Sequence, residues 1–409
     1  MSNIEQLLST IPFLNREGSK RESIALQNVV REILPDSRVA ACLRHRLGGS
    51  AVSVSTTDHG NTRLGGLMVC DAGHICPVCH GRKMAREQRI VSRIVHDHYQ
   101  AGGILIDSVL TAPHHAGEPL SCGLDRQDAI WKKFRTSPIW NELTRNLGVI
   151  GCIRRREVTL GAHGWHPHFH VSFLCDPARA AGVKGQSWRT ALEDAFAIVS
   201  GAWRQAAAEV GVTVCEEAQA AVAIIGHVDA QKALSYNMKN MGYCRKANSL
   251  TPMDLLRVAA QINDVAVVHT AKRLFAEYAA AIKGRHILSL TGSAKAARNA
   301  AVEAADVACA EVMEEQLGTV SPGAWSAIVK AGLRETLATV KSRRELVAVV
   351  LRAALGAGHG RIPFQWMRLS FETKTVISVK AASPWCSLGK ASGGHDYVKR
   401  VEAHTVSVR

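Results

Sequence analysis

The chain has 409 residues, of which 47% are hydrophobic and 21% are charged, enough to build one large core or two to three ordinary ones. Fifty Lys and Arg against 35 Asp and Glu give a formal charge of +15, which favours a polyanionic partner such as nucleic acid. The longest apolar stretches, such as 220–225, are too short to span a membrane, and no signal peptide is visible, so a membrane protein is not expected.

Residues 1–38 form a polar, partly helical lead without identifiable chemistry. The next segment holds three close cysteines, Cys70, Cys76 and Cys79, in a Cys-x5-Cys-x2-Cys array. Three close thiols indicate zinc, whose closed structural sites take four ligands in a tetrahedron. His74 and His80 are nearby candidates for the fourth ligand. The alternative is a set of reduced cysteines that bind nothing. The odd total of 11 cysteines argues against disulfides.

Residues 82–95 follow this array and predict a helix with one strongly basic face. Such a face can lie along DNA phosphates. An amphipathic helix whose apolar side packs on the core is the compatible alternative.

From Gly103 onward, strand and helix patterns alternate. They predict an α+β fold, an antiparallel sheet flanked by helices. The expected elements are a strand at 103–112, a helix at 126–146, strands at 148–160 and 165–175, a helix at 188–210, a strand at 220–228 and a helix at 230–243.

The most informative of these strands carries histidines at alternate positions: His166, His168 and His170. Successive side chains of a strand point to opposite faces, so the three imidazoles share one face and can converge on an ion. Apolar residues, including Phe169 and Phe173, occupy the other face. Packed or solvated histidines without a metal are the alternative.

The preceding strand supplies a carboxylate for the same face. If Leu160 and Trp165 flank a hairpin loop, Glu157 lies opposite His168 and Arg155 lies opposite His170. Two imidazoles and a carboxylate leave open positions on a divalent ion. A register slip of one residue would turn Glu157 away, leaving it a surface carboxylate that balances neighbouring arginines.

Tyr236 and Lys239 share one face of the helix expected at 230–243. At this spacing the ammonium of Lys239 can favour the phenolate of Tyr236 and the charge of an attacked phosphate. An ordinary amphipathic surface pair is the alternative.

Together these motifs resemble the HUH endonucleases, and most closely the single-tyrosine initiators of plasmid rolling-circle replication. The resemblance covers roughly residues 40 to 290. It rests on the strand that ends in Leu110-Thr111 with His114 and His115 after it, on the histidine strand, on the tyrosine helix, and on residues 275–285.

The resemblance implies a ferredoxin- or RRM-like core and a nicking and joining reaction at the plasmid origin. Tyr236 would attack a DNA phosphate, assisted by Mg²⁺ or Mn²⁺, giving a 5′-phosphotyrosine link and a free 3′-hydroxyl. It further implies DNA as substrate and a bacterial cytoplasmic location. It also implies a host helicase and polymerase as partners, because the chain has no phosphate-binding Gly loop that would indicate its own helicase activity.

The resemblance also indicates which residues bind each metal ion. His168 and His170 match the family's metal pair, while His166 is a third ligand, a supporting group or a DNA contact. Cys42 is the preferred fourth zinc ligand, because relatives often carry an early cysteine. Some relatives have a second catalytic tyrosine one turn after the first, where this chain has Asn240; Tyr243 is the nearest other tyrosine.

After Gly284 the sequence becomes alanine-rich and helical, consistent with a DNA-recognition or oligomerisation module. Two short strands are expected around residues 363–380, before a basic tail. The predicted division is therefore a lead at 1–38, a zinc knuckle and basic helix at 39–100, a nicking domain at 101–290, a helical module at 291–360, and strands with a tail at 361–409.

Two alternatives in other classes remain. One is a conjugative relaxase or single-strand transposase with the same chemistry, although relaxases usually place the tyrosine before the histidines. The other is a zinc-dependent DNA-binding regulator without enzymatic activity, in which the histidine strand is structural.

Overall fold

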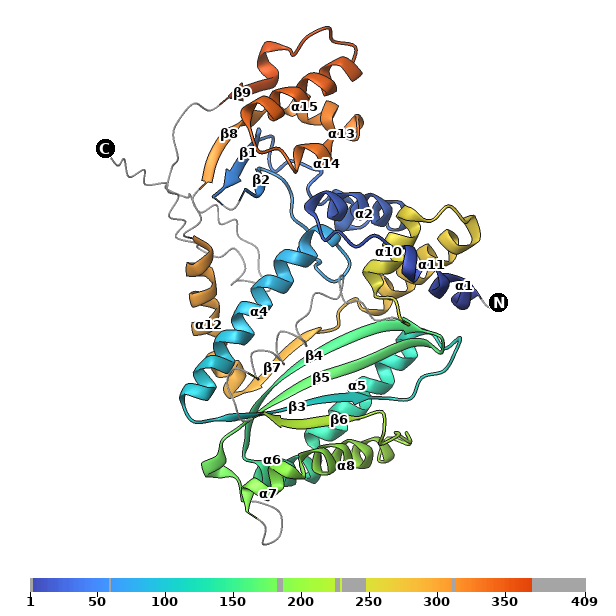
Figure 1. The fold of residues 1–409 in the computed structure, drawn as a ribbon, viewed down its shortest axis with the longest axis vertical. Helices are drawn as coiled ribbons and strands as arrows, with labels where there is room; N and C mark the ends of the chain where they lie inside the picture. The colour runs from blue at the N-terminus through green and yellow to red at the C-terminus, as the bar shows by residue number, and fades with distance from the viewer. Residues whose placement is uncertain are drawn as a thin grey trace, which may run out of the picture. The chain divides into compact units, whose positions relative to one another are not determined.

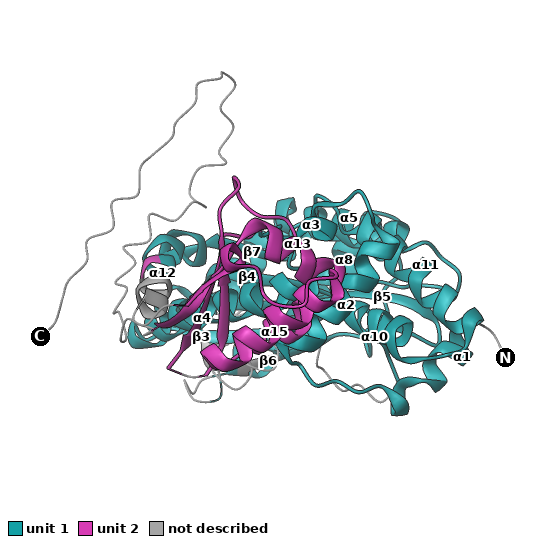
Figure 2. Cartoon of the chain, turned by 90° about the horizontal axis from the view of Figure 1, so that it is seen from above, with its two compact units in different colours: residues 1–42, 69–302 teal, residues 43–68, 303–409 magenta. Residues whose placement is uncertain are grey.

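A computed structural model describes residues 3–58, 60–181, 187–224, 229, 248–310 and 314–369. The chain forms two compact units (Figures 1 and 2): the first comprises Met1–Cys42 and Val69–Val302, and the second comprises Leu43–Met68 and Glu303–Arg409. None of the helices in the described ranges has the length and apolarity needed to cross a membrane. Both units combine antiparallel sheets with helices, so the α+β prediction is confirmed at this level.

The first unit is built on a five-stranded antiparallel sheet in the order β6-β3-β5-β4-β7. The central strand β5 pairs with β3 on one side and β4 on the other, so both of its edges are hydrogen-bonded. The strands are β3 (Ile104–Thr111), β4 (Val149–Gly161), β5 (Gly164–Cys175), β6 (Ala220–Ile224) and β7 (Leu288–Gly292).

One face of this sheet carries the main core of the unit. Phe169, Val171 and Phe173 of β5 pack there with Phe134 and Trp203 of the covering helices. Figure 1 shows these helices together on one side of the sheet. They are α5 (Leu120–Thr136), α6 (Pro138–Leu147), α7 (Trp188–Glu193) and α8 (Ala195–Ala208).

The other face is covered by α4 (Pro77–Gln100), which Figure 1 shows on the side of the sheet away from α5 and α8. Its apolar residues, including Ile90, Val91 and Ile94, are buried. The remaining helices of the first unit are α1 (Asn3–Ser9), α2 (Lys20–Ile33), α3 (Arg38–Ala41), α10 (Pro252–Gln261), α11 (Val265–Ala281) and the start of α12 (Ser293–Ala310).

The N-terminal lead belongs to this unit through buried ion pairs. Arg257 of α10 lies 2.6 Å from Glu22 of α2 and 3.0 Å from Asp254, and all three side chains are buried. Arg16 adds a 2.8 Å contact to Asp254. Because a buried charge is tolerated only with partners, these contacts fix α2 against α10.

The second unit has a four-stranded antiparallel sheet in the order β2-β1-β8-β9. Val54 and Val320 of the sheet, with Trp325 and Val350 of the helices, form its core. Its elements are β1 (Val52–Thr57), β2 (Thr62–Gly65), β8 (Glu314–Val320), α13 (Pro322–Lys330), α14 (Arg334–Leu337), α15 (Arg343–Gly356) and β9 (Met367–Leu369).

The structure differs from the predicted elements in several places. The helix expected at 188–210 is divided into α7 and α8, and the segment expected at 39–100 also contains β1 and β2. The helix expected at 126–146 is two helices, because Ser137-Pro138 interrupts the hydrogen-bond ladder and Pro138 starts α6. The helical module expected at 291–360 contains the strand β8, which pairs with β1 from far upstream in the chain. Strand β9 lies within the strand region expected at 363–380, and residues after 369 lie outside the described part.

Candidate metal centres

The β4–β5 hairpin places the first candidate site. Its strands are joined by the two-residue turn Ala162-His163, after which Gly164 has a φ of 89°, a value that favours glycine. The resulting register pairs Leu160 with Trp165 and Glu157 with His168, as the sequence predicted. Arg155 likewise pairs with His170, so this prediction is also confirmed.

Glu157, His168 and His170 converge on this face. Oε2 of Glu157 lies 3.1 Å from Nε2 of His168 and 2.9 Å from Nε2 of His170. Ligands at right angles on an ion about 2.1 Å away are themselves about 3 Å apart, so the observed spacing fits an octahedral divalent cation. The three ligand atoms form one of two groups, among the described residues, that can hold a metal.

His166 takes a different position from the other two histidines. Its ring stacks on that of His114, with centroids 4.6 Å apart and planes 20° from parallel, and it is not a member of the metal group. Burial lowers the pKa of His114, which favours its neutral form. His166 therefore contacts His114, which lies just after β3, and is not part of the metal group.

The end of β3 beside this site is held by groups that the sequence analysis did not identify. Thr111 pairs with His168, and its amide N–H donates to Oε1 of Gln219 at 2.7 Å. Nε2 of Gln219 donates back to the Thr111 hydroxyl at 2.8 Å, and the indole of Trp203 donates to the Thr111 carbonyl at 2.7 Å. These bonds fix the strand that borders the histidines.

Arg155 lies buried on the same face and faces α4. One of its terminal nitrogens is 2.8 Å from the sulfur of Met84. Burial lowers the pKa of Arg155, while the carboxylates of Glu87 and Glu157 act in the opposite direction. Arg155 is thus a buried cation whose charge is influenced by a helix carboxylate and by the carboxylate of the metal group, a position that the basic run at 154–156 alone did not reveal.

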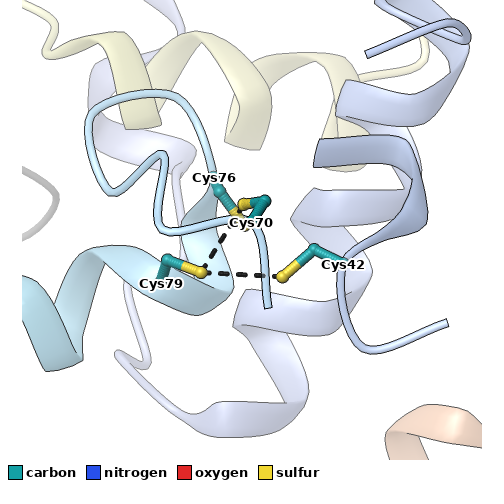
Figure 3. A group of neighbouring side chains, drawn as sticks. All are labelled: Cys42, Cys70, Cys76 and Cys79. Carbon is teal, nitrogen blue, oxygen red and sulfur yellow. Dashed lines mark hydrogen bonds between the residues drawn. The ribbon is translucent and has the colours of Figure 1, made fainter. Parts of the chain in front are cut away.

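The second candidate centre consists of Cys42, Cys70, Cys76 and Cys79 (Figure 3), all buried and all reduced. The sulfur of Cys79 lies 3.6 Å from those of Cys42 and Cys70, far longer than a disulfide bond. Sulfurs bound tetrahedrally at about 2.3 Å from zinc are about 3.8 Å apart, so the group fits such an ion. Hydrogen bonding with the other three thiols lowers the pKa of Cys79, while the same contacts raise the pKa of Cys76.

Local structure positions each cysteine. Cys42 caps α3, and its carbonyl accepts from the side chain of Gln27 on α2. Cys76 is the N-cap of α4, and Cys79 lies in its first turn. The alternative ligands are outside the group: Nδ1 of His80 bonds the Gly73 carbonyl at 2.7 Å. Burial, with smaller effects of Lys83 and other nearby cations, lowers the pKa of His74 to about 3.

Tyr236 and Lys239 lie outside the described residues, as do Asn240 and Tyr243. The structure does describe the residues that flank this segment. Ile224, at the end of β6, pairs with Leu105 of β3. Leu250 pairs with Leu160, three residues beyond Glu157 on β4.

Comparison with known proteins gives partial matches. No family model and no solved structure matches the chain. A neomycin resistance protein of Streptomyces cyanogenus is 29% identical over 169 residues, covering 34% of this chain and 38% of that protein. A protein of Streptomyces lividans named "Protein rep" is 26% identical over 152 residues, covering 31% of this chain and 33% of that protein. The similarity thus covers between 33% and 38% of the length of these curated relatives.

Proposed function

We propose that this chain initiates plasmid rolling-circle replication by nicking and rejoining one DNA strand at the origin, in the manner of the single-tyrosine HUH endonucleases. The observation that carries the proposal is the convergence of Glu157, His168 and His170 at ligand spacing on the central strand of the sheet. The partial similarity to a protein named "Protein rep" supports a role in plasmid replication. The formal charge of +15 supports DNA as the partner.

Glu157, His168 and His170 would hold Mg²⁺ or Mn²⁺, both of which accept carboxylate ligands together with imidazole. When bound, the ion supplies Lewis acidity to a phosphate oxygen. The surrounding structure orients these three ligands. The hairpin register sets Glu157 opposite His168. Gln219 and Trp203 hydrogen-bond Thr111 and so fix the neighbouring end of β3.

Tyr236 is the proposed nucleophile. Its oxygen forms a bond to phosphorus, the bond from phosphorus to the 3′ oxygen breaks, and the released 3′ oxygen takes up a proton. The energy of the phosphodiester is thereby kept in a 5′-phosphotyrosine for later rejoining. Lys239 favours the phenolate, since a nearby cation lowers the pKa of a tyrosine.

Chain connectivity supports this assignment. Tyr236 follows Ile224 by twelve residues and precedes Leu250 by fourteen. At up to about 3.3 Å per residue, either connection can span about 40 Å, so chain length permits Tyr236 to act at the metal group.

The cysteine group would hold structural Zn²⁺ and so fix the start of α4. A host helicase and polymerase would act on the nicked DNA in the bacterial cytoplasm. These partners follow from the proposed reaction, which yields a primer end but does not itself unwind or extend DNA.

The test uses a supercoiled plasmid that carries the DNA flanking the gene, incubated with the protein and Mn²⁺ or Mg²⁺. We expect nicked circles and a covalent protein–DNA adduct that resists denaturation. Tyr236→Phe should form no adduct, whereas the control Tyr243→Phe should form it. An adduct with Tyr236→Phe would refute the nucleophile, and absence of nicking by the wild type would favour the non-enzymatic regulator.

A further inference from the structure

Four arginines lie between helix α5 and the sheet edge at β7, and two of them lack an acidic partner. Arg156 and Arg285 both pair with Asp128. Among the described residues, no carboxylate forms an ion pair with Arg135 or Arg154. Arg154 is only 8% exposed, and Arg135 is half-buried. Because burying a charge is costly without a partner, these two cations lack the compensation that their burial requires.

Aromatic rings hold these two guanidinium groups in place of carboxylates. The guanidinium carbon of Arg135 lies 3.7 Å from the ring centre of Trp140. That of Arg154 lies 4.9 Å from the ring centre of Trp131 and 4.5 Å from that of Phe169. Stacking uses the face of a guanidinium group and leaves the N–H groups at its rim for an acceptor. Among the described residues, the buried Nε of Arg154 has no hydrogen-bond partner.

Two hydroxyl groups of the edge strand β7 lie beside the same cations. A terminal nitrogen of Arg154 donates to Oγ of Ser289 at 3.1 Å. A terminal nitrogen of Arg135 lies 3.9 Å from the sulfur of Cys152, which lies 3.0 Å from the hydroxyl oxygen of Thr291. Ser289 and Thr291 are two residues apart in β7, so they share a face of the sheet about 7 Å apart. Donors from two guanidinium and two hydroxyl groups therefore lie along one short stretch of the sheet edge.

The electrostatics of this group favour an anion. Burial, together with repulsion from Arg156, lowers the pKa of Arg154 to about 10, while Asp128 acts in the opposite direction. Burial also lowers the pKa of Arg135. An anion bound to both guanidinium groups would offset these effects, because it stabilises their charged forms.

We propose that Arg135, Arg154, Ser289 and Thr291 bind a phosphate group, either inorganic phosphate or the terminal phosphate of a DNA strand. Two guanidinium groups can donate to different oxygens of one phosphate through hydrogen bonds of about 2.8 Å. A terminal phosphate offers three free oxygens and is linked to the DNA on one side only. An internal phosphodiester continues on both sides, which the burial of Arg154 disfavours.

This phosphate site is separate from the candidate metal group. Arg154 and Glu157 are three residues apart in β4, so their side chains point to opposite faces of the sheet. Phosphate binding at Arg154 requires neither a divalent ion nor nicking. The inference therefore does not rest on the proposed function.

The test measures the binding of inorganic phosphate by isothermal titration calorimetry, without divalent ions so that phosphate cannot bind through a catalytic metal. Arg135→Gln and Arg154→Met each remove one cation from the site. Each should weaken phosphate binding by at least about tenfold, the effect of losing a hydrogen bond to a charged group. Thr291→Val keeps the shape of the side chain and should weaken binding by a smaller factor.

The matched control is Arg145→Gln. Arg145 is an exposed arginine of α6, and its replacement removes the same single charge. Its affinity for phosphate should equal that of the wild type. If Arg154→Met does not fold, Arg135→Gln decides the test, because Arg135 is only half-buried.

Two short oligonucleotides of one sequence, with a 5′-phosphate or a 5′-hydroxyl, identify the source of the phosphate. Displacement of inorganic phosphate by the 5′-phosphate strand alone identifies a DNA end as the ligand, and displacement by neither strand identifies inorganic phosphate. Displacement by both strands would overturn the inference, because the 5′-hydroxyl strand offers only internal phosphodiesters. Absence of phosphate binding by the wild type, or equal affinity in the wild type and both arginine variants, would overturn it as well.

Discussion

A terminal nitrogen of Arg155 lies 2.8 Å from the sulfur of Met84. This contact joins two parts of the first unit: α4, which begins at the cysteine group, and β4, which carries Glu157. The two candidate centres are therefore connected by one helix and one buried cation. A substitution at one candidate centre should therefore have a measurable effect at the other.

Replacing Arg155 tests this connection. Arg155→Met removes a buried cation whose charge acts on Glu87 and Glu157, so both carboxylates lose a nearby opposite charge. We expect the free energy of unfolding to fall by about 3 kcal/mol. Urea unfolding followed by tryptophan fluorescence measures it, with the exposed Lys132→Met as control. Equal stability of Arg155→Met and wild type would show that the cation is dispensable.

Removing one cysteine should empty the second centre. Cys42 is the ligand most distant in sequence, and without its sulfur the group cannot close a tetrahedron. We expect purified wild type to retain about one zinc per chain, and Cys42→Ser to retain little after dialysis against a mild chelator. The exposed Cys122→Ser is the control. Elemental analysis that finds equal zinc in all three proteins would exclude this ligand set.

Glu157→Gln tests the carboxylate of the first centre. Glutamine keeps the size of the side chain but removes the charge that lies beside both imidazole nitrogens. The dissociation constant for Mn²⁺ should rise by at least about tenfold, the effect expected even for a group that only supports a ligand. Titration monitored by electron paramagnetic resonance measures it, with surface Glu216→Gln as control. An unchanged constant would place the ion elsewhere.

Stability should also depend on pH through His98. Burial lowers its pKa, and its Nε2 donates to the Ile104 carbonyl at 2.9 Å. Below about pH 6.5 the unfolded chain binds a proton at this residue that the folded chain does not, so the free energy of unfolding falls as pH falls. The free energy of unfolding stops falling once the pH is below the pKa that His98 has in the folded chain. His98→Gln should weaken this dependence in urea unfolding between pH 7 and 5, and an identical dependence would contradict it.

The hairpin was predictable because its register depends on local features. A short glycine-flanked loop and strict alternation favoured the register that places Glu157 with His168 and His170, and the structure has this register. The cysteine group was predictable from spacing for Cys70, Cys76 and Cys79. Placement of Cys42 beside them required a resemblance, since no local pattern links it to residues almost thirty positions away.

What the sequence did not reveal depends on distant pairs. Glu22 reads as an exposed helix carboxylate, yet its partner Arg257 lies more than two hundred residues later. Gln219 has no motif, and its role comes from Thr111 on another strand. Strand β8 begins with two glutamates and follows an alanine-rich helix, so only pairing with β1 makes it a strand. Tertiary partners override local propensity in each case.

The central claim is that Glu157, His168 and His170 form a metal-dependent nicking centre. Conversion of the supercoiled plasmid to nicked circles in Mn²⁺ tests it most directly, comparing wild type with His168→Ala, His170→Ala. We expect the wild type to nick only with the divalent ion and the double variant to be reduced by at least about a hundredfold, consistent with loss of metal-assisted catalysis. Nicking by the double variant at the wild-type rate, or equal nicking in excess chelator, would contradict the account.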